Sequence, residues 1–392
     1  MRRFLQELQD FPKKCDWVLL MLCLITAAFG LVVIASATSA AKFEGNARYI
    51  IIQMAGILLG VGAYAVMSSI DIEAMSERRN WLVAFNCFLL LMLIPFGTDA
   101  GTGNRSWLDF PLLPINIQPA EICKITYVII MASVMNSHQN SISGIPSVMH
   151  MVLHLGILAG MNMVMSRDAG VTLIFVFIFI GMAFSGGVHL GWFALAIGAI
   201  VVAAPFIWPM LGEYQQERIL ILIDPTFDAQ GIGARYHSKI NLLSLTGGGL
   251  TGQGLFNGTR TQGGFLFAQH TDYIFSSIGE ELGYFGCVFV MLLQFAIIAR
   301  CVWVGMRCQD YIRRLVCYGA ASALMFQVII NVGMCIGVMP VIGLTLPFVS
   351  YGGSSIVTLY TMLGLVSGVF ARPASTSQER YVKPPYMYRY KI

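Results

Sequence analysis

The chain has 392 residues, of which 57% are hydrophobic and 11% are charged, and its mean hydropathy is +0.72. A soluble domain of this length could not bury so much apolar surface in one core, so the composition excludes a soluble enzyme and indicates a polytopic membrane protein. The net charge is +4, and the nine cysteines show neither a disulfide framework nor zinc-ligand spacing.

A helix needs about 20 apolar residues to cross a bilayer, and ten segments of the sequence fit. They lie near residues 16–37, 49–69, 81–97, 115–136, 146–165, 169–186, 188–209, 272–300, 314–338 and 344–371. The first follows basic residues, but it is of full length and lacks a convincing cleavage site, which favours a retained span over a signal peptide. The sequence therefore predicts an all-α fold of about ten transmembrane helices.

The basic residues predict the orientation in the membrane. Fifteen of the 24 Lys and Arg residues lie on the side of both termini and eight lie on the other side. Short cytoplasmic loops carry the basic excess, so we expect a cytoplasmic N-terminus (1–15), a transmembrane domain (16–371) and a cytoplasmic basic tail (372–392). The loop 211–269 between helices 7 and 8 is then extracellular, and its length indicates a functional loop or a small subdomain. Its glycines at 247–254 lack the pattern of a nucleotide loop, so we expect a tightly packed backbone and no nucleotide.

Three carboxylates lie at the mouth of the eighth span and inside it. An acidic residue at the centre of a membrane helix costs roughly 2.5 to 3.5 kcal/mol, so such residues are functional by default. Asp272 begins the span with His270 and Thr271, and it fits either a helix cap or a general base beside a polar cavity; the two roles are compatible. Glu280 and Glu281 lie two to three turns deeper and point in different directions. We interpret both as structural charges that pair with polar groups on neighbouring spans.

Other charged residues also allow two interpretations. Glu121 and Lys124 are three residues apart on one helix face, as in an internal ion pair, but Lys124 facing a cavity would also suit a phosphate. Asp168 fits an N-cap of the sixth span and is interpreted as structural. Arg105 and Trp107, in an outer loop, fit an interfacial anchor or a grip on phosphate and sugar.

Several long motifs occur along the chain. They are Trp107, QPAEICK at 118–124, DAGVT at 168–172, Asp224-Pro225, GGGLTGQG at 247–254, HTDYIF at 270–275, NVGM at 331–334, MPVIG at 339–343 and LPFVSYGGSS at 346–355. Together they resemble the SEDS family of bacterial membrane proteins (shape, elongation, division and sporulation), which includes RodA, FtsW and SpoVE. The likeness covers nearly the whole chain, and residues 238–240 and 257–262 are most similar to the RodA type.

The resemblance implies a peptidoglycan glycosyltransferase that polymerises lipid II at the outer face of the bacterial cytoplasmic membrane, for elongation, division or sporulation. It places the family's catalytic carboxylate on Asp272. The expected substrate-binding residues are Arg105, Trp107, Glu121, Lys124, Arg218, Lys239, His270 and Thr271. The implied partners are lipid II, glycan linked to undecaprenyl pyrophosphate, the membrane and a class B penicillin-binding protein, with no nucleic acid. The small residues Gly333 and Gly337 suggest the contact face for that protein.

In the expected reaction, Asp272 takes a proton from the 4-hydroxyl of the acceptor sugar. This hydroxyl attacks the anomeric carbon of the lipid-linked donor and expels undecaprenyl pyrophosphate. Arg105, Lys124, Arg218 and Lys239 are the candidate cations for the leaving group. Pyrophosphate chemistry also favours a divalent cation, Mg or Mn, although no ligand cluster is visible in the sequence. Two rival functions stay open, a lipid II flippase and a non-catalytic scaffold of the cell-wall synthesis machinery.

The chain departs from the family pattern at three places. Phe267-Ala268 replaces the usual Pro-Glu shortly before the His-Thr-Asp motif, Ser166-Arg167 replaces a common Gln-Pro before Asp168, and Tyr236-His237 replaces a common Tyr-Gln or Tyr-Asn. The missing loop carboxylate leaves open how the substrate is positioned.

Overall fold

The computed structural model describes residues 11–40, 47–98, 105–109, 117–210, 212–224, 228 and 236–372. Within these residues, eight helices are long and apolar enough to cross a membrane, and two more apolar helices are shorter. The predicted all-α membrane fold of about ten transmembrane helices is therefore confirmed. The start of the predicted N-terminal segment, nearly all of the basic tail and parts of three outer loops lie outside the described residues.

The helices of the N-terminal half follow the predicted spans closely. In chain order the elements are α2 (Phe11–Lys14), α3 (Trp17–Ala37), α4 (Arg48–Ser68), α5 (Ile72–Glu77), α6 (Arg79–Leu91), α7 (Leu93–Phe96), β1 (Gly97–Thr98), β2 (Trp107–Leu108), α8 (Pro119–Ser137), η2 (Gln139–Ser141), α9 (Ile145–Ser166) and α10 (Ala169–Ser185). Aspartates fix several starts, because the side chains of Asp16, Asp71 and Asp168 accept backbone N–H groups at the first turns of α3, α5 and α10.

The C-terminal half contains the long loop and the last three spans. Its elements are α11 (Leu190–Ile207), η3 (Trp208–Met210), α12 (Glu213–Ile223), α13 (Tyr236–Gly247), α14 (Thr259–Gln262), α15 (Ile274–Arg307), α16 (Tyr311–Cys335) and α17 (Gly353–Ala371). The last span begins at Gly353 and not near residue 344 as predicted, because residues 336–352 form no helix or strand and contain Pro340 and Pro347. The eighth span is longer than predicted and is broken at Gly283.

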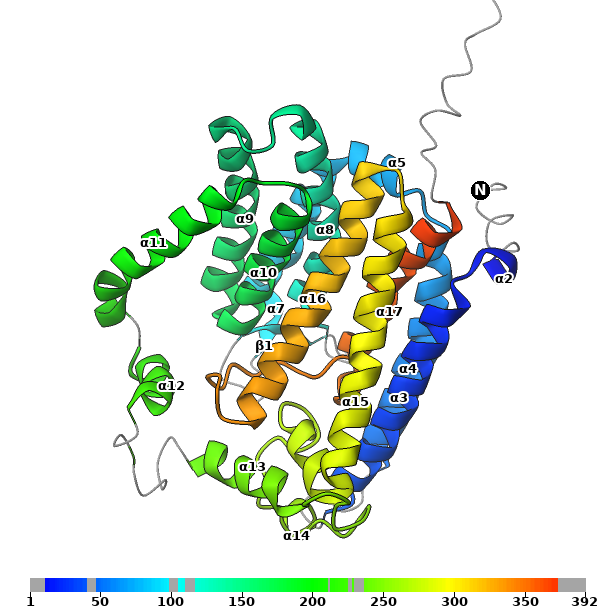
Figure 1. Ribbon diagram of the computed structural model, residues 1–392, viewed down its shortest axis with the longest axis vertical. Helices are drawn as coiled ribbons and strands as arrows, with labels where there is room; N and C mark the ends of the chain where they lie inside the picture. The colour runs from blue at the N-terminus through cyan, green and yellow to red at the C-terminus, as the bar shows by residue number, and fades with distance from the viewer. Residues whose placement is uncertain are drawn as a thin grey trace, which may run out of the picture.

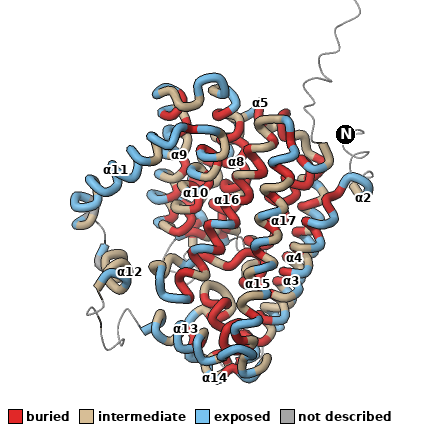
Figure 2. Tube along the Cα trace, viewed as in Figure 1, coloured by how far each residue is buried: buried red, intermediate tan, exposed pale blue. Residues whose placement is uncertain are grey.

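The core lies along α8, α16 and α17, the three spans that are mostly buried. α17 packs along α4, and α16 packs along α15, α10 and α8. α11 projects away from the bundle, and its described side chains are largely exposed (Figures 1 and 2). The apolar surface of the outer helices suits contact with lipid.

Both ends of the described chain lie at one end of the bundle. Residues of α2 and the end of α17 line one small pocket there, which includes Lys14 and Arg372. α13 and α14 lie at the opposite end (Figure 1). We call these the α5 end and the α13 end.

Buried ion pairs hold the α5 end together, and the sequence analysis did not pair them. Asp16, which is 1% exposed, accepts two hydrogen bonds of 2.9 Å from Arg300. The Arg300 guanidinium also lies 4.1 Å from the centre of the Trp303 ring. Arg313 lies 3.3 Å from Glu73. Removing one partner of such a buried pair leaves an uncompensated charge, so these contacts fix the relative positions of α3, α5, α15 and α16.

Candidate active site

The glycine-rich loop repairs a break in α15. Gly283 has φ 67° and ψ −161°, which interrupts the helical hydrogen bonds on both sides of it. Backbone N–H groups of residues 253 and 254 donate to the carbonyls of Glu280 and Glu281 at 3.0 and 2.9 Å, and the N–H of Tyr284 donates back to the carbonyl of Gly249 at 2.9 Å. The loop therefore supplies the partners that a continuous helix would have supplied.

The side chains of the two deep glutamates hold the same loop. Glu280 is fully buried and accepts two backbone N–H groups at the start of α14, both at 2.9 Å, and the Thr261 hydroxyl at 2.7 Å. Glu281 accepts the Ser36 hydroxyl at 2.5 Å and the Gln262 amide at 2.8 Å. Most of these partners lie in the loop, whereas the sequence analysis expected them on neighbouring spans.

A segment distant in the sequence fixes the backbone of the His-Thr-Asp motif. The carbonyls of residues 270, 271 and 272 accept hydrogen bonds from the Tyr351 N–H at 2.8 Å, the Ser350 hydroxyl at 2.6 Å and the Asn331 amide at 2.8 Å. Asn331 is fully buried and uses the same nitrogen to donate to the Leu344 carbonyl at 2.7 Å. Residues distant in the sequence thus hold three consecutive carbonyls of the motif.

Two nearby charges act on the Asp272 carboxylate in opposite directions. It stays partly exposed, and a Cβ atom placed on Gly343 would lie 3.5 Å from its Oδ2. Burial raises the pKa of Asp272 to about 6, the Arg218 guanidinium acts to lower it, and the negative charge of Asp168 adds to the rise. Arg218 itself donates to the Val341 carbonyl, two residues before Gly343. A carboxyl with this pKa is mostly ionised at neutral pH and remains basic enough to accept a proton.

Asp168 connects the 118–124 motif, at the start of α8, with the surroundings of Asp272. It caps α10 by accepting the Val171 N–H at 3.0 Å and accepts the Gln118 amide at 3.1 Å. Glu121 and Lys124 are both buried and lie 3.5 Å apart. Burial raises the pKa of Asp168, against the lowering effects of its backbone hydrogen bonds and of Lys124. The charges of α8, α10 and the Asp272 segment therefore act on one another.

Trp107 lies on a two-stranded hairpin beside this group. β1 and β2 are antiparallel, with Thr98 opposite Trp107, and the exposed Arg105 donates to the Gly97 carbonyl at 3.4 Å. The Ser106 hydroxyl donates to the carbonyl of Ser166 at 3.4 Å. Because Ser166 is two positions before Asp168 in the sequence, this contact places the hairpin near Asp168.

The remaining predicted substrate-binding residues are less closely grouped. The His270 ring meets Tyr49 and Tyr351 with centroid distances of 5.1 and 5.6 Å. Lys239 is exposed on α13. Two departures from the family pattern contact each other, because the His237 and Phe267 rings lie 4.8 Å apart. This contact adjoins Ala268, the position at which the family pattern has a carboxylate.

Sequence reasoning assigned no role to Asn331, Ser350 or Gln118. All three are buried polar residues in otherwise apolar surroundings. That property is the signal that could have singled them out, since buried polar groups are normally held by hydrogen bonds.

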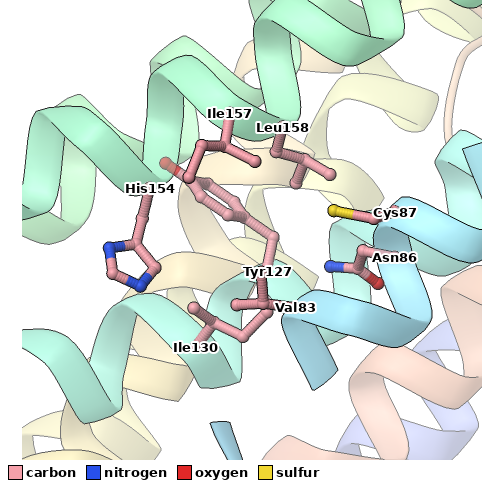
Figure 3. A pocket seen from close by; sticks show the side chains of 8 residues that line it. All are labelled: Val83, Asn86, Cys87, Tyr127, Ile130, His154, Ile157 and Leu158. Atoms are coloured by element: carbon pink, nitrogen blue, oxygen red, sulfur yellow. The ribbon is translucent and has the colours of Figure 1, made fainter. Parts of the chain in front are cut away.

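The described residues show one small cavity on the α9 side of the bundle and no metal centre. They contain no group of three His, Cys, Asp or Glu side chains that could hold a metal ion. A cavity of about 10 Å³ lies between α6, α8 and α9 (Figure 3). It is lined by Val83, Asn86, Cys87, Tyr127, Ile130, His154, Ile157 and Leu158. This volume suits about one water molecule and is too small for a glycolipid.

Comparisons with known proteins agree on one group. A family model for FtsW, RodA and SpoVE, described as cell cycle protein, matches residues 16–373. A Thiomicrospira cyclica protein named probable peptidoglycan glycosyltransferase FtsW is 33% identical over 364 residues, which is 89% of either chain. The Escherichia coli peptidoglycan glycosyltransferase MrdB is 30% identical over 318 residues, covering 80% of this chain and 83% of its own.

Solved structures show the same fold. A chain from a peptidoglycan synthase complex, reported for its coordination of polymerization and crosslinking, superposes with a TM-score of 0.76 at 28% identity. The match covers 94% of this chain and 99% of that one. The rod shape determining protein RodA of Thermus thermophilus gives 0.68 at 24% identity, over 92% and 98%.

Proposed function

Because the chain belongs to the FtsW/RodA/SpoVE family of cell cycle proteins, we propose that Asp272 is the general base of a glycosyl transfer between lipid II molecules. The chain is a peptidoglycan glycosyltransferase, as are its named relatives. One observation supports the assignment most strongly. Asp272 is a partly exposed carboxylate with a pKa of about 6, on a backbone fixed by three hydrogen bonds.

The reaction assigns a role to each part of the site. The Asp272 carboxylate accepts the proton of the acceptor 4-hydroxyl as the oxygen bonds to the anomeric carbon of the donor. The bond from that carbon to the pyrophosphate oxygen breaks, and the anion leaves with the undecaprenyl chain. Arg218 and Lys124 are the cations near Asp272 and Asp168, and they suit the developing charge on the pyrophosphate. Trp107 and the exposed Arg105 and Lys239 suit contacts with sugar and phosphate farther out.

A divalent cation stays a proposal drawn from pyrophosphate chemistry. The described residues offer no group of three ligands to hold one, so no step of the mechanism is assigned to it. Polymerisation with EDTA, and then with Mg²⁺ or Mn²⁺ restored, tests the requirement.

The charge distribution favours polymerisation over flipping. Alternating access places the substrate near the middle of the membrane and opens each end in turn. Here the partly exposed Asp272 lies toward the α13 end. Buried ion pairs such as Asp16 with Arg300 hold the helices together at the α5 end. A scaffold would need no partly exposed carboxylate with a raised pKa.

The proposed setting follows from the same features. The α13 end faces the outside of the bacterial cytoplasmic membrane, and both termini are cytoplasmic. A class B penicillin-binding protein is the proposed partner, supported by the likeness to a chain of a peptidoglycan synthase complex. Gly333 and Gly337, suggested above as its contact face, do not share one face of α16. Gly333 packs against Met339 of the same chain, and Gly337 lies beyond the end of α16.

Polymerisation of purified lipid II in detergent by the Asp272→Asn protein tests the base. The amide keeps the size of the side chain and removes the proton acceptor, so we expect the rate to fall by about 10² to 10⁴. The melting temperature should be unchanged or higher, because burial disfavours the charge that is removed. Near-normal polymer from a folded Asp272→Asn protein would contradict the assignment.

A further inference from the structure

The connection between α16 and α17, residues 336–352, packs against Asp272 although it contains no charged side chain. Val341 accepts a hydrogen bond from Arg218, Gly343 faces the carboxylate, and Leu344 shares the Asn331 amide with Asp272. One stretch of backbone thus contacts the acid, the nearby cation and the residue that anchors the acid.

Three donors join this connection to the motif that carries the acid. We call Asn331, Ser350 and the Tyr351 N–H the carbonyl clamp. Asn331 is fully buried, and Ser350 is 6% exposed and also accepts the Leu346 N–H at 2.8 Å. Residues 270–272 precede the first turn of α15, so the regular helix does not hold their carbonyls.

From this geometry, and on the basis of the proposed function, we propose that Asn331 and Ser350 are positioning residues that set the distance of the Asp272 carboxylate from the acceptor hydroxyl and from Arg218. Neither side chain needs to touch substrate. A displacement of about 1 Å in a reacting group can cost about 10²-fold in rate, and the clamp fixes the acid at the backbone, where a shift moves the whole residue.

The charges around Asp272 give the proposal a specific readout. The groups that act on it are Arg218 from α12 and Asp168 at the start of α10. Among the described residues, Cys335 of α16 and Tyr273 are further titratable neighbours. If the clamp sets the distance to Arg218, its loss weakens the effect of Arg218, and the pKa of Asp272 rises. A residue that only stabilises the fold would leave that pKa where it is.

The test measures lipid II polymerisation against pH for Asn331→Leu and Ser350→Ala. We expect kcat to fall by about 10²-fold with KM little changed. The acid limb, which is the part of the pH–rate profile where the rate falls toward low pH, should move to higher pH. Ser350→Thr keeps the hydroxyl and should recover most of the rate lost in Ser350→Ala. If Asn331→Leu does not fold, the comparison of Ser350→Ala with Ser350→Thr tests the positioning role alone.

Gln294→Met is the matched control. Gln294 is 1% exposed and donates to the Pro347 carbonyl at 2.6 Å, so it anchors the same connection without touching residues 270–272. The substitution Gln294→Met should lower the melting temperature and leave the acid limb unmoved.

Normal kcat in folded Asn331→Leu and Ser350→Ala proteins, or an equal shift of the acid limb in Gln294→Met, would overturn the positioning role. Measuring Asp272→Asn in the same assay distinguishes a failure of the proposed general base from a failure of the carbonyl clamp. An active Asp272→Asn protein refutes the general base itself, whereas an inactive one beside active clamp variants refutes the clamp alone.

Discussion

The pH dependence of polymerisation is the most direct consequence of the Asp272 environment. A base with a pKa of about 6 is about nine-tenths ionised at pH 7 and about one-tenth ionised at pH 5. Because only the ionised form accepts the proton, kcat/KM should fall roughly tenfold between these values, with its midpoint near pH 6.

Two substitutions should move that midpoint in opposite directions. Arg218 favours the ionised carboxylate, so Arg218→Gln should raise the pKa of Asp272 and shift the limb to higher pH. Asp168 disfavours it, so Asp168→Asn should shift the limb to lower pH, while the amide can still cap α10. The assay is the initial rate of lipid II polymerisation per amount of folded protein between pH 5 and pH 8.

Acid unfolding would not imitate this result through Asp272. The pKa of this carboxyl is higher in the folded chain than in the unfolded chain, so its protonation stabilises the fold as pH falls through 6. Melting temperatures across the same pH range provide the control. A limb that neither substitution moves, or that both move in the same direction, would refute the electrostatic reasoning.

Three further predictions concern the loop and the orientation. Glu280→Gln should cost about 1 to 3 kcal/mol of stability, because an amide cannot accept all three of the hydrogen bonds that the carboxylate accepts. The melting temperature of this variant should fall more than its specific activity, and the reverse pattern would point to a role in the reaction. Gly252→Ala should lower the melting temperature markedly, because φ is +81° and the new Cβ would lie 2.2 Å from the Glu281 carbonyl. Gly160→Ala, which has open space around it, should leave the melting temperature unchanged. Equal melting temperatures of the two variants would contradict the tight packing. A cysteine at the exposed Thr251 should react with an impermeant reagent from outside intact cells, and labelling only from the cytoplasmic side would overturn the topology.

The spans were predictable because each is a long apolar run with its own local signals. Asp16, Asp71 and Asp168 mark helix starts directly in the sequence. The error at the last span also has a local cause. Residues 344–352 are apolar enough to read as membrane helix, but they form an irregular connection that is buried against the bundle. Hydropathy measures burial and cannot distinguish a surrounding of lipid from one of protein.

The site was predictable only as a set of candidates. Asp272, Asp168, Glu121 and Lys124 stand out as charges in apolar segments. The ways in which they act on one another, however, depend on the proximity of residues that are about 40 to 100 positions apart in the sequence. Asn331 and Ser350 carry no charge, and their partners are backbone carbonyls, which every residue has. A sequence pattern therefore gives no indication of which carbonyl is bound.

The break at Gly283 explains why one loop has so many glycines. A side chain on Gly252 or Gly283 would meet backbone atoms of the other segment within 2.4 Å. The exchange of hydrogen bonds across the break therefore needs glycine on both sides, and it ties the loop to the same helix that Asp272 precedes. The break at Gly283 lies about three helical turns from the acid along the chain. The buried contacts of Glu280 and Glu281 hold the loop against the broken helix, so the two deep carboxylates have a structural role at the break.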